Sequence, residues 1–172
     1  MTIEATGRVE PSASGPVIVI ERTFRAPVAD VWDTVVDPQR MDRWIGTWTG
    51  EPGAGKRVAF VMSAEGASEP EDVLIHGCDP PSHLDVESFQ AAGSWRLAVD
   101  LAEKGGLTTL VFRQVVDPAD EAASSYGPGW EYYLDRLSAV LEGTEFAAWD
   151  DYYPAQLAHW QEQLRRFISD EP

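Results

Sequence analysis

Residues 127–143 read GPGWEYYLDRLSAVLEG, and the rest of the chain has to fit the element that this stretch forms. Its apolar residues recur three or four positions apart, which places them on one stripe of an α-helix. They are Trp130, Tyr133, Leu134, Leu137, Val140 and Leu141. Pro128 suits a first helical turn, where no backbone N–H is needed, and Gly143 suits the left-handed residue that ends a helix. The stretch therefore predicts a long helix with one buried face.

The segments before this helix read as β-strands. Residues 17–25 are β-branched and then alternate, which predicts a first strand with Ile18, Ile20 and Phe24 on one face. Residues 28–36 have helical spacing, and residues 39–44 fit one further helical turn. Five runs with a period of two follow, separated by Gly, Pro and Asp: 57–63, 71–77, 83–89, 94–101 and 107–116. We expect an antiparallel meander, and pairing of the first strand with the last makes a sheet of about six strands.

The domain organisation follows from these elements. Residues 1–16 have too little apolar surface to offset the cost of ordering them, so a flexible N-terminal arm is expected. Residues 17–143 form the sheet-and-helix domain. In the extension 144–172, an acidic and aromatic segment precedes a second amphipathic helix that carries Trp160 and Leu164. The apolar stripe of that helix is expected to cover its own domain, with a neighbouring subunit as the alternative.

Composition and charge exclude several classes of function. The 172 residues suffice for one domain with a sizeable core. The 29 acidic and 13 basic side chains give a net charge of −16, so neither nucleic acid nor an anionic membrane is expected as a partner. No apolar run reaches the roughly 20 residues that span a bilayer, and no signal-peptide pattern is present, so a cytoplasmic protein is expected. Cys78 is the only cysteine, which excludes an internal disulfide.

Short motifs follow one another along these elements. They are Ala26-Pro27, Val31-Trp32-Asp33, Asp37-Pro38, Arg43-Trp44, Gly129-Trp130 and Leu134-Asp135-Arg136-Leu137. Their order resembles the SRPBCC or START-like superfamily, and within it the branch named after activators of a heat-shock-protein ATPase. The resemblance covers residues 17–143. It implies the helix-grip fold, an α+β arrangement in which a curved antiparallel sheet surrounds a long C-terminal helix, often with a cavity between them.

Aromatic side chains supply the candidate site. In the fold that the resemblance implies, they converge around the cavity and its mouth, and aromatic-lined concavities are the usual form of small-molecule sites. The candidate ligand-binding residues are Trp44, Trp48, Phe60, Met62, His76, Phe89, Trp95, Phe112, Tyr126, Trp130 and Tyr133. The alternative is that the same side chains fill the space and leave only a packed core.

Other motifs do not indicate chemistry. Residues 50–57 approach a phosphate-binding loop, but Arg57 stands where a hydroxyl is needed, and a strand follows where the motif needs a helix. The three histidines, at positions 76, 83 and 159, lack the spacing of a metal site, and no G-x-S-x-G elbow occurs. We therefore assign no catalytic residue, metal or cofactor.

Three functional hypotheses follow from the resemblance and the residues, because the fold alone does not select among its activities. The first is a non-enzymatic binder of an apolar or aromatic small molecule. The second is an enzyme of the cyclase or aromatase type, in which Arg96, His76, Tyr126 or Glu131 moves protons in the same cavity. The third is an interaction module, whose C-terminal helix or acidic surface docks a chaperone or forms a homodimer.

Overall fold

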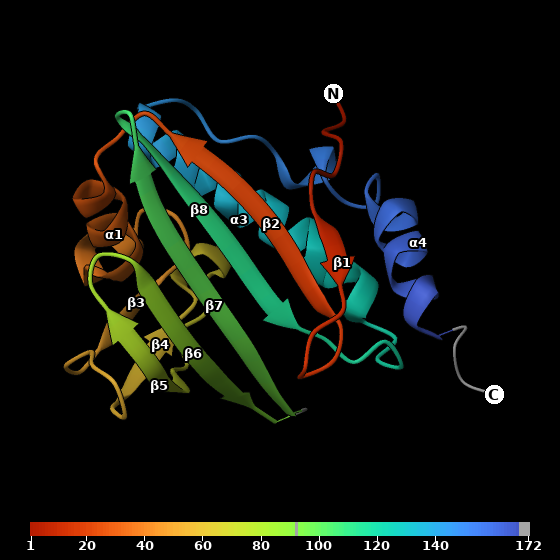
Figure 1. Cartoon of the computed structure of the whole chain (residues 1–172), viewed down its shortest axis with the longest axis horizontal. Coiled ribbons are helices and arrows are strands. Elements are labelled where there is room, and N and C mark those ends of the chain that lie inside the picture. The colour runs from red at the N-terminus through yellow and green to blue at the C-terminus, as the bar shows by residue number, and fades with distance from the viewer. Residues whose placement is uncertain (92, 169–172) are drawn as a thin grey trace.

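The computed structural model describes residues 1–91 and 93–168. Within these residues, eight strands form one antiparallel sheet in the order β1-β2-β8-β7-β6-β5-β4-β3 (Figure 1). The strands are β1 (Arg8–Glu10), β2 (Val17–Phe24), β3 (Thr47–Thr49), β4 (Arg57–Val61), β5 (Glu71–Asp79), β6 (His83–Gln90), β7 (Gly93–Lys104) and β8 (Leu107–Val115).

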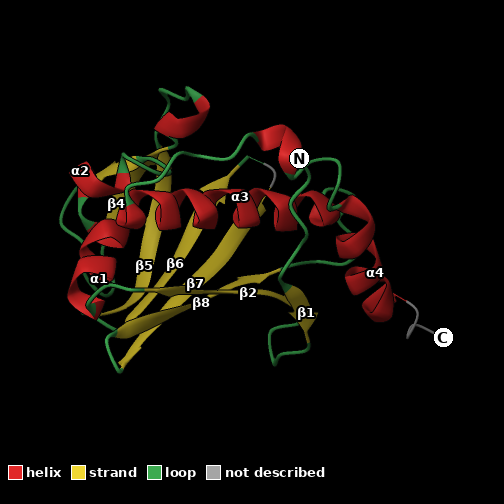
Figure 2. Ribbon diagram, turned by 90° about the horizontal axis from the view of Figure 1, so that it is seen from above, coloured by secondary structure: helices red, strands yellow, loops and turns green. Residues whose placement is uncertain are grey.

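Helices cover one face of this sheet, which we call the inner face. They are α1 (Val28–Val36), α2 (Pro38–Met41), α3 (Ala123–Glu142) and α4 (Leu157–Ile168), with single 3-10 turns η1 (Ser63–Glu65) and η2 (Trp149–Asp151). Figure 2 shows α3 lying along the curved sheet, with α1 and α2 near one end of it and α4 near the other. This is the helix-grip arrangement that the sequence predicts. Over the described part of the chain, no helix is both long and apolar enough to cross a membrane.

The strand pairing confirms the expected closure of the meander. β2 pairs antiparallel with β8, and Ile20 lies opposite Phe112. The predicted sheet of about six strands is too small by two, because β1 and β3 extend it at its two edges. Each of these strands has three residues, which is too short for an alternating pattern to stand out in the sequence.

The N-terminal segment is not the flexible arm that its composition predicts. β1 pairs with β2, and Val9 lies opposite Ile18. The carboxylate of Glu131, which is fully buried in α3, accepts hydrogen bonds from the backbone N–H groups of Thr6 (2.7 Å) and Gly7 (2.8 Å). These contacts with distant residues supply the ordering energy that the local composition lacks.

The long helix starts earlier than predicted. α3 begins at Ala123, so Pro128 lies inside the helix and not in its first turn. The added turn is stabilised by tertiary contacts, because Ala123 is buried and the ring of Tyr126 lies 4.7 Å from that of Trp95. These contacts outweigh the weak helix propensity of the serines and glycine in this turn. At the other end, Gly143 has a φ of 69° and closes the helix as expected.

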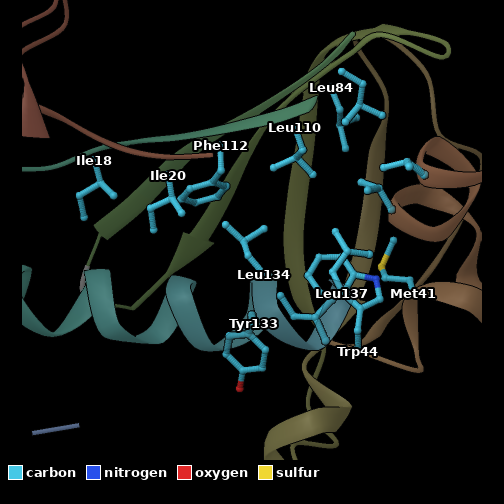
Figure 3. Close-up of a cluster of buried hydrophobic side chains, with 14 of the residues drawn as sticks. Ile18, Ile20, Met41, Trp44, Leu84, Leu110, Phe112, Tyr133, Leu134 and Leu137 are labelled. Carbon is cyan, nitrogen blue, oxygen red and sulfur yellow. The ribbon is translucent and has the colours of Figure 1, made fainter. Parts of the chain in front are cut away.

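The core lies between α3 and the inner face. Figure 3 shows Leu134 pointing from α3 toward the sheet, where Ile20 and Phe112 point back at it. Ile18, Ile20 and Leu137 have no exposed surface. Burial of each such side chain stabilises the fold by about 1.5–3 kcal/mol.

The second C-terminal helix packs on its own chain. The apolar stripe of α4 contacts α3 and β1, and the side chains of Trp160 and Leu164 are buried. The indole of Trp160 lies directly against Gly7 and Gly127. Between the two helices, the hydroxyl of Tyr152 donates a hydrogen bond of 2.7 Å to Asp135 of α3. The extension is therefore built into the fold, with α4 near the end of α3 that lies away from α1 (Figure 2).

Candidate functional site

A partly open cavity of about 640 Å³ lies between α3 and the inner face of the sheet. Its wall is mainly aromatic and aliphatic. Nine of the eleven candidate residues line it: Trp44, Trp48, Phe60, Met62, Trp95, Phe112, Tyr126, Trp130 and Tyr133. The aromatic set therefore surrounds a space and does not fill it. That these side chains bind a ligand stays a prediction.

The other two candidates, His76 and Phe89, lie away from the cavity. β6 turns Ser88 toward the cavity, so Phe89 has the opposite parity and is exposed, with the guanidinium of Arg57 5.2 Å from its ring centroid. His76 sits at a β-bulge in β5, and its Nε2 lies 2.8 Å from the carboxylate of Glu87. Strand parity accounts for both positions, because Val73 and Ile75 of β5 are buried and His76 alternates with them.

Trp130 has a fixed orientation in the cavity wall. Its indole Nε1 donates a hydrogen bond of 2.7 Å to Oε1 of Gln114, which is 1% exposed. Its ring lies 4.3 Å from that of Phe112. The hydrogen bond satisfies the buried amide oxygen of Gln114 and the indole N–H of Trp130 together, so this part of the wall is pre-organised.

Tyr133 connects α3 to the loop at the mouth of the cavity. Its hydroxyl, which Figure 3 shows turned away from the sheet, donates a hydrogen bond of 2.7 Å to Glu65 of η1. Burial, and after it the hydrogen bond to Glu65, raise the pKa of Tyr133 above its usual range. The phenol therefore stays protonated at neutral pH and acts as a donor.

Tyr126 is held in a similar way at the start of α3. Its hydroxyl donates a hydrogen bond of 2.6 Å to Asp120. Burial and this carboxylate raise the pKa of Tyr126 to about 12. The same hydrogen bond lowers the pKa of Asp120. The phenol is thus no base at neutral pH.

The remaining residues considered for proton transfer face elsewhere. Arg96 forms two hydrogen bonds with Asp85, of 2.6 and 2.8 Å, outside the cavity. Glu131 is buried, but it faces the N-terminal segment and Arg22, whose Nη2 lies 2.6 Å from it. Of the four residues considered for proton transfer, only Tyr126 lines the cavity; Arg96, His76 and Glu131 do not. Among the described residues, no cluster of three or more His, Cys, Asp or Glu is arranged to hold a metal ion.

The structure adds an aromatic pair that the sequence did not assign to the site. Trp149 of η2 and Tyr153 stack with ring centroids 5.4 Å apart and planes 9° apart, and both line the cavity. They are 40% and 37% exposed, as expected at a mouth. The acidic and aromatic composition of 144–153 was the available signal, but nothing in it tells where the segment docks.

Two carboxylates also belong to the wall, Glu65 and Glu71. Oε2 of Glu71 accepts a hydrogen bond of 2.9 Å from the hydroxyl of Ser88. On the same wall, the indole Nε1 of Trp48 is buried and has no partner among the described residues. Acidic residues are so abundant in this sequence that no spacing singles these two out.

An α+β fold in which a curved sheet surrounds a long helix, with an apolar cavity between them, defines a protein of the helix-grip class. A family model described as "Activator of Hsp90 ATPase homolog 1-like protein" matches residues 25–142. Since the match spans more than half of the chain, this protein belongs to that family. The resemblance to the SRPBCC superfamily is confirmed by this match, and the solved structures that are similar share the fold.

Solved structures show the same fold at low sequence identity. CalU16 from Micromonospora echinospora has a TM-score of 0.65 and 21% identity, over 96% of this chain and 95% of its own. MLL2253 from Mesorhizobium loti has a TM-score of 0.65 and 20% identity, over 76% and 99%. DynU16, titled as a protein in the dynemicin biosynthetic locus, has a TM-score of 0.65 and 20% identity, over 73% of this chain and 47% of its own. The comparison with curated proteins found no match.

Proposed function

We propose that this protein binds an apolar or aromatic small molecule in the cavity between α3 and the sheet. The observation that carries the proposal is the cavity itself. Its volume of about 640 Å³ falls within the roughly 300–1,000 Å³ of small-molecule sites. Its wall combines aromatic surface with a few hydrogen-bonded polar groups, which is the composition of such sites.

The cavity volume bounds the ligand and its affinity. If each non-hydrogen atom takes roughly the 30 Å³ of one liquid water, the cavity accommodates about twenty such atoms. At about 0.3 kcal/mol per atom, a ligand of that size gains about 6 kcal/mol on binding. This corresponds to a Kd on the order of tens of micromolar.

The enzyme hypothesis has less support. Of the residues considered for proton transfer, Tyr126 alone reaches the cavity, and its raised pKa keeps it protonated. The interaction-module hypothesis also has less support, because the apolar stripe of α4 is covered by α3 and β1 of the same chain. A pulldown with a chaperone and light scattering at several concentrations test that third hypothesis directly.

Gly129 offers a direct test of the binding site. It lines the cavity, and a Cβ added there meets no atom within 4 Å. Gly129→Phe should therefore place a ring in the cavity without disturbing the core, while Gly129→Ala leaves nearly all of the volume free. We expect at least about tenfold weaker binding of a hydrophobic dye by Gly129→Phe, and unchanged binding by Gly129→Ala.

Native mass spectrometry of gently purified protein complements the dye measurement by detecting a retained ligand. Circular dichroism checks that both variants fold. If folded Gly129→Phe binds the dye as tightly as the unaltered protein does, the dye binds elsewhere and the assignment of the cavity is wrong.

A further inference from the structure

The charged side chains that line the cavity have one sign. Glu65 and Glu71 line it, and among the described lining residues there is no Lys, Arg or His. The whole chain carries a net charge of −16, so its average field adds to the local one. A carboxylate or phosphate that entered this cavity would lose water without meeting a basic side chain.

The two carboxylates are held in place. Oε2 of Glu71 accepts from the hydroxyl of Ser88, a residue that is 6% exposed. Glu65 accepts from the hydroxyl of Tyr133 through Oε1. Each carboxylate therefore has a second oxygen without a partner among the described residues. A pre-oriented acceptor of this kind favours a ligand that brings N–H donors.

The aromatic wall has the same preference. Five of the seven tryptophans line the cavity: Trp44, Trp48, Trp95, Trp130 and Trp149. The face of an indole carries negative charge density and attracts a cation placed over it, more strongly than a phenol or phenyl ring does. Aromatic walls of this kind, together with carboxylates, attract organic ammonium groups.

We propose that the ligand of this cavity is a hydrophobic organic cation, such as an arylalkyl or alicyclic amine, and not a fatty acid or another organic anion. This inference rests on the proposed binding function and specifies the chemistry of its ligand. The apolar body of the ligand packs against the indoles, and its ammonium group donates to Glu71 or Glu65.

Three probes of nearly equal size and different charge test the inference. They are 1-pyrenemethylamine, 1-pyrenemethanol and 1-pyrenecarboxylate, whose binding at neutral pH is read by energy transfer from tryptophan to pyrene. We expect the amine to bind about tenfold more tightly than the alcohol, which corresponds to 1.4 kcal/mol, and the carboxylate to bind most weakly.

Charge-removing variants locate the preference. Glu71→Gln and Glu65→Gln should each reduce the amine-to-alcohol affinity ratio, and together they should remove most of it. Glu87→Gln is the matched control, because it removes the same charge from a residue outside the cavity. Its amine-to-alcohol ratio should equal that of the unaltered protein.

The possible failures are distinct. If none of the three probes binds, the proposed binding function itself is wrong. If the alcohol binds and the carboxylate binds as tightly as the amine, the cavity binds small molecules but the inference about charge is wrong. If Glu87→Gln lowers the ratio as much as Glu71→Gln does, the preference comes from the overall field and not from the cavity carboxylates.

Discussion

Gly127 and Gly129 lie two positions apart in α3 and have different surroundings. A Cβ on Gly127 would lie 2.1 Å from two ring atoms of Trp160, whereas a Cβ on Gly129 meets nothing within 4 Å. Trp160 cannot yield easily, because its side chain has no exposed surface and Gly7 contacts it as well. The same replacement, glycine by alanine, should therefore change stability in opposite directions at the two positions.

The expected magnitudes follow from these contacts. At position 129, alanine removes the helix penalty of glycine and should raise the free energy of unfolding by about 0.8–1 kcal/mol. At position 127, the same gain is outweighed if the indole of Trp160 leaves its site, which costs about 3–5 kcal/mol. The two variants should then differ by at least about 3 kcal/mol, or about 6 °C in Tm for a chain of this length.

Thermal and urea unfolding of Gly127→Ala and Gly129→Ala measure this difference, with the unaltered protein as the reference. A double-mutant cycle with Trp160→Ala isolates the contact, since Gly127→Ala should cost little once the indole is gone. Equal stability of the two alanine variants, or additive effects in the cycle, would refute the packing of α4 against Gly127.

Three further outcomes are expected. Glu131→Gln removes one of the two carboxylates that pair with the half-buried guanidinium of Arg22, which keeps Asp135, and should lower the free energy of unfolding in urea by about 1.5–3 kcal/mol; stability equal to that of the unaltered protein would contradict this ion pair. Tyr152→Phe removes the hydrogen bond to Asp135 and should lower the free energy of unfolding by about 1.5–3 kcal/mol in the same assay. An unchanged free energy of unfolding would show that this hydrogen bond is absent. The pKa of Tyr126 is raised to about 12 in the folded protein, above the ordinary value of about 10, so its contribution to stability is full below pH 10 and is lost as the pH rises through 12. Ultraviolet titration against Tyr126→Phe should show one phenol ionising near pH 12, and ionisation near pH 10 would show that it is not buried.

Periodicity predicted the elements that are buried on one side. The stripe of α3 and the alternation of β7 and β8 placed Trp95, Phe112 and Trp130 correctly, because each of these elements presents one face to the core. Phe89 and His76 were misplaced because the inward-facing parity of their strands was not identified; Ser88 and Val73 line the cavity, and both candidates have the opposite parity. Aromatic character indicates burial only when the position also faces inward.

Contacts between the chain ends could not be predicted from local patterns. Glu131 lies among the polar residues of the predicted helix, and nothing near it in the sequence shows that Thr6 and Gly7 bind it. Trp149 reaches the cavity only because the extension turns back along α3. The contacts of Glu131 and of Trp149 both depend on how the terminal segments dock on the domain. The periodicity of a segment carries no information about where that segment docks.

The volume of the cavity indicates that it is not empty in the folded protein. Empty apolar volume costs about 24 cal/mol per Å³, so a dry void of about 640 Å³ would cost about 15 kcal/mol. That equals or exceeds the whole stability of an ordinary domain, about 5–15 kcal/mol. The space between α3 and the sheet is therefore occupied, by solvent entering through the open mouth or by a ligand. A ligand that replaces this solvent stabilises the folded chain by about 2.7 kcal/mol at a concentration of 100 times its Kd, so an increase in Tm is itself a readout of binding.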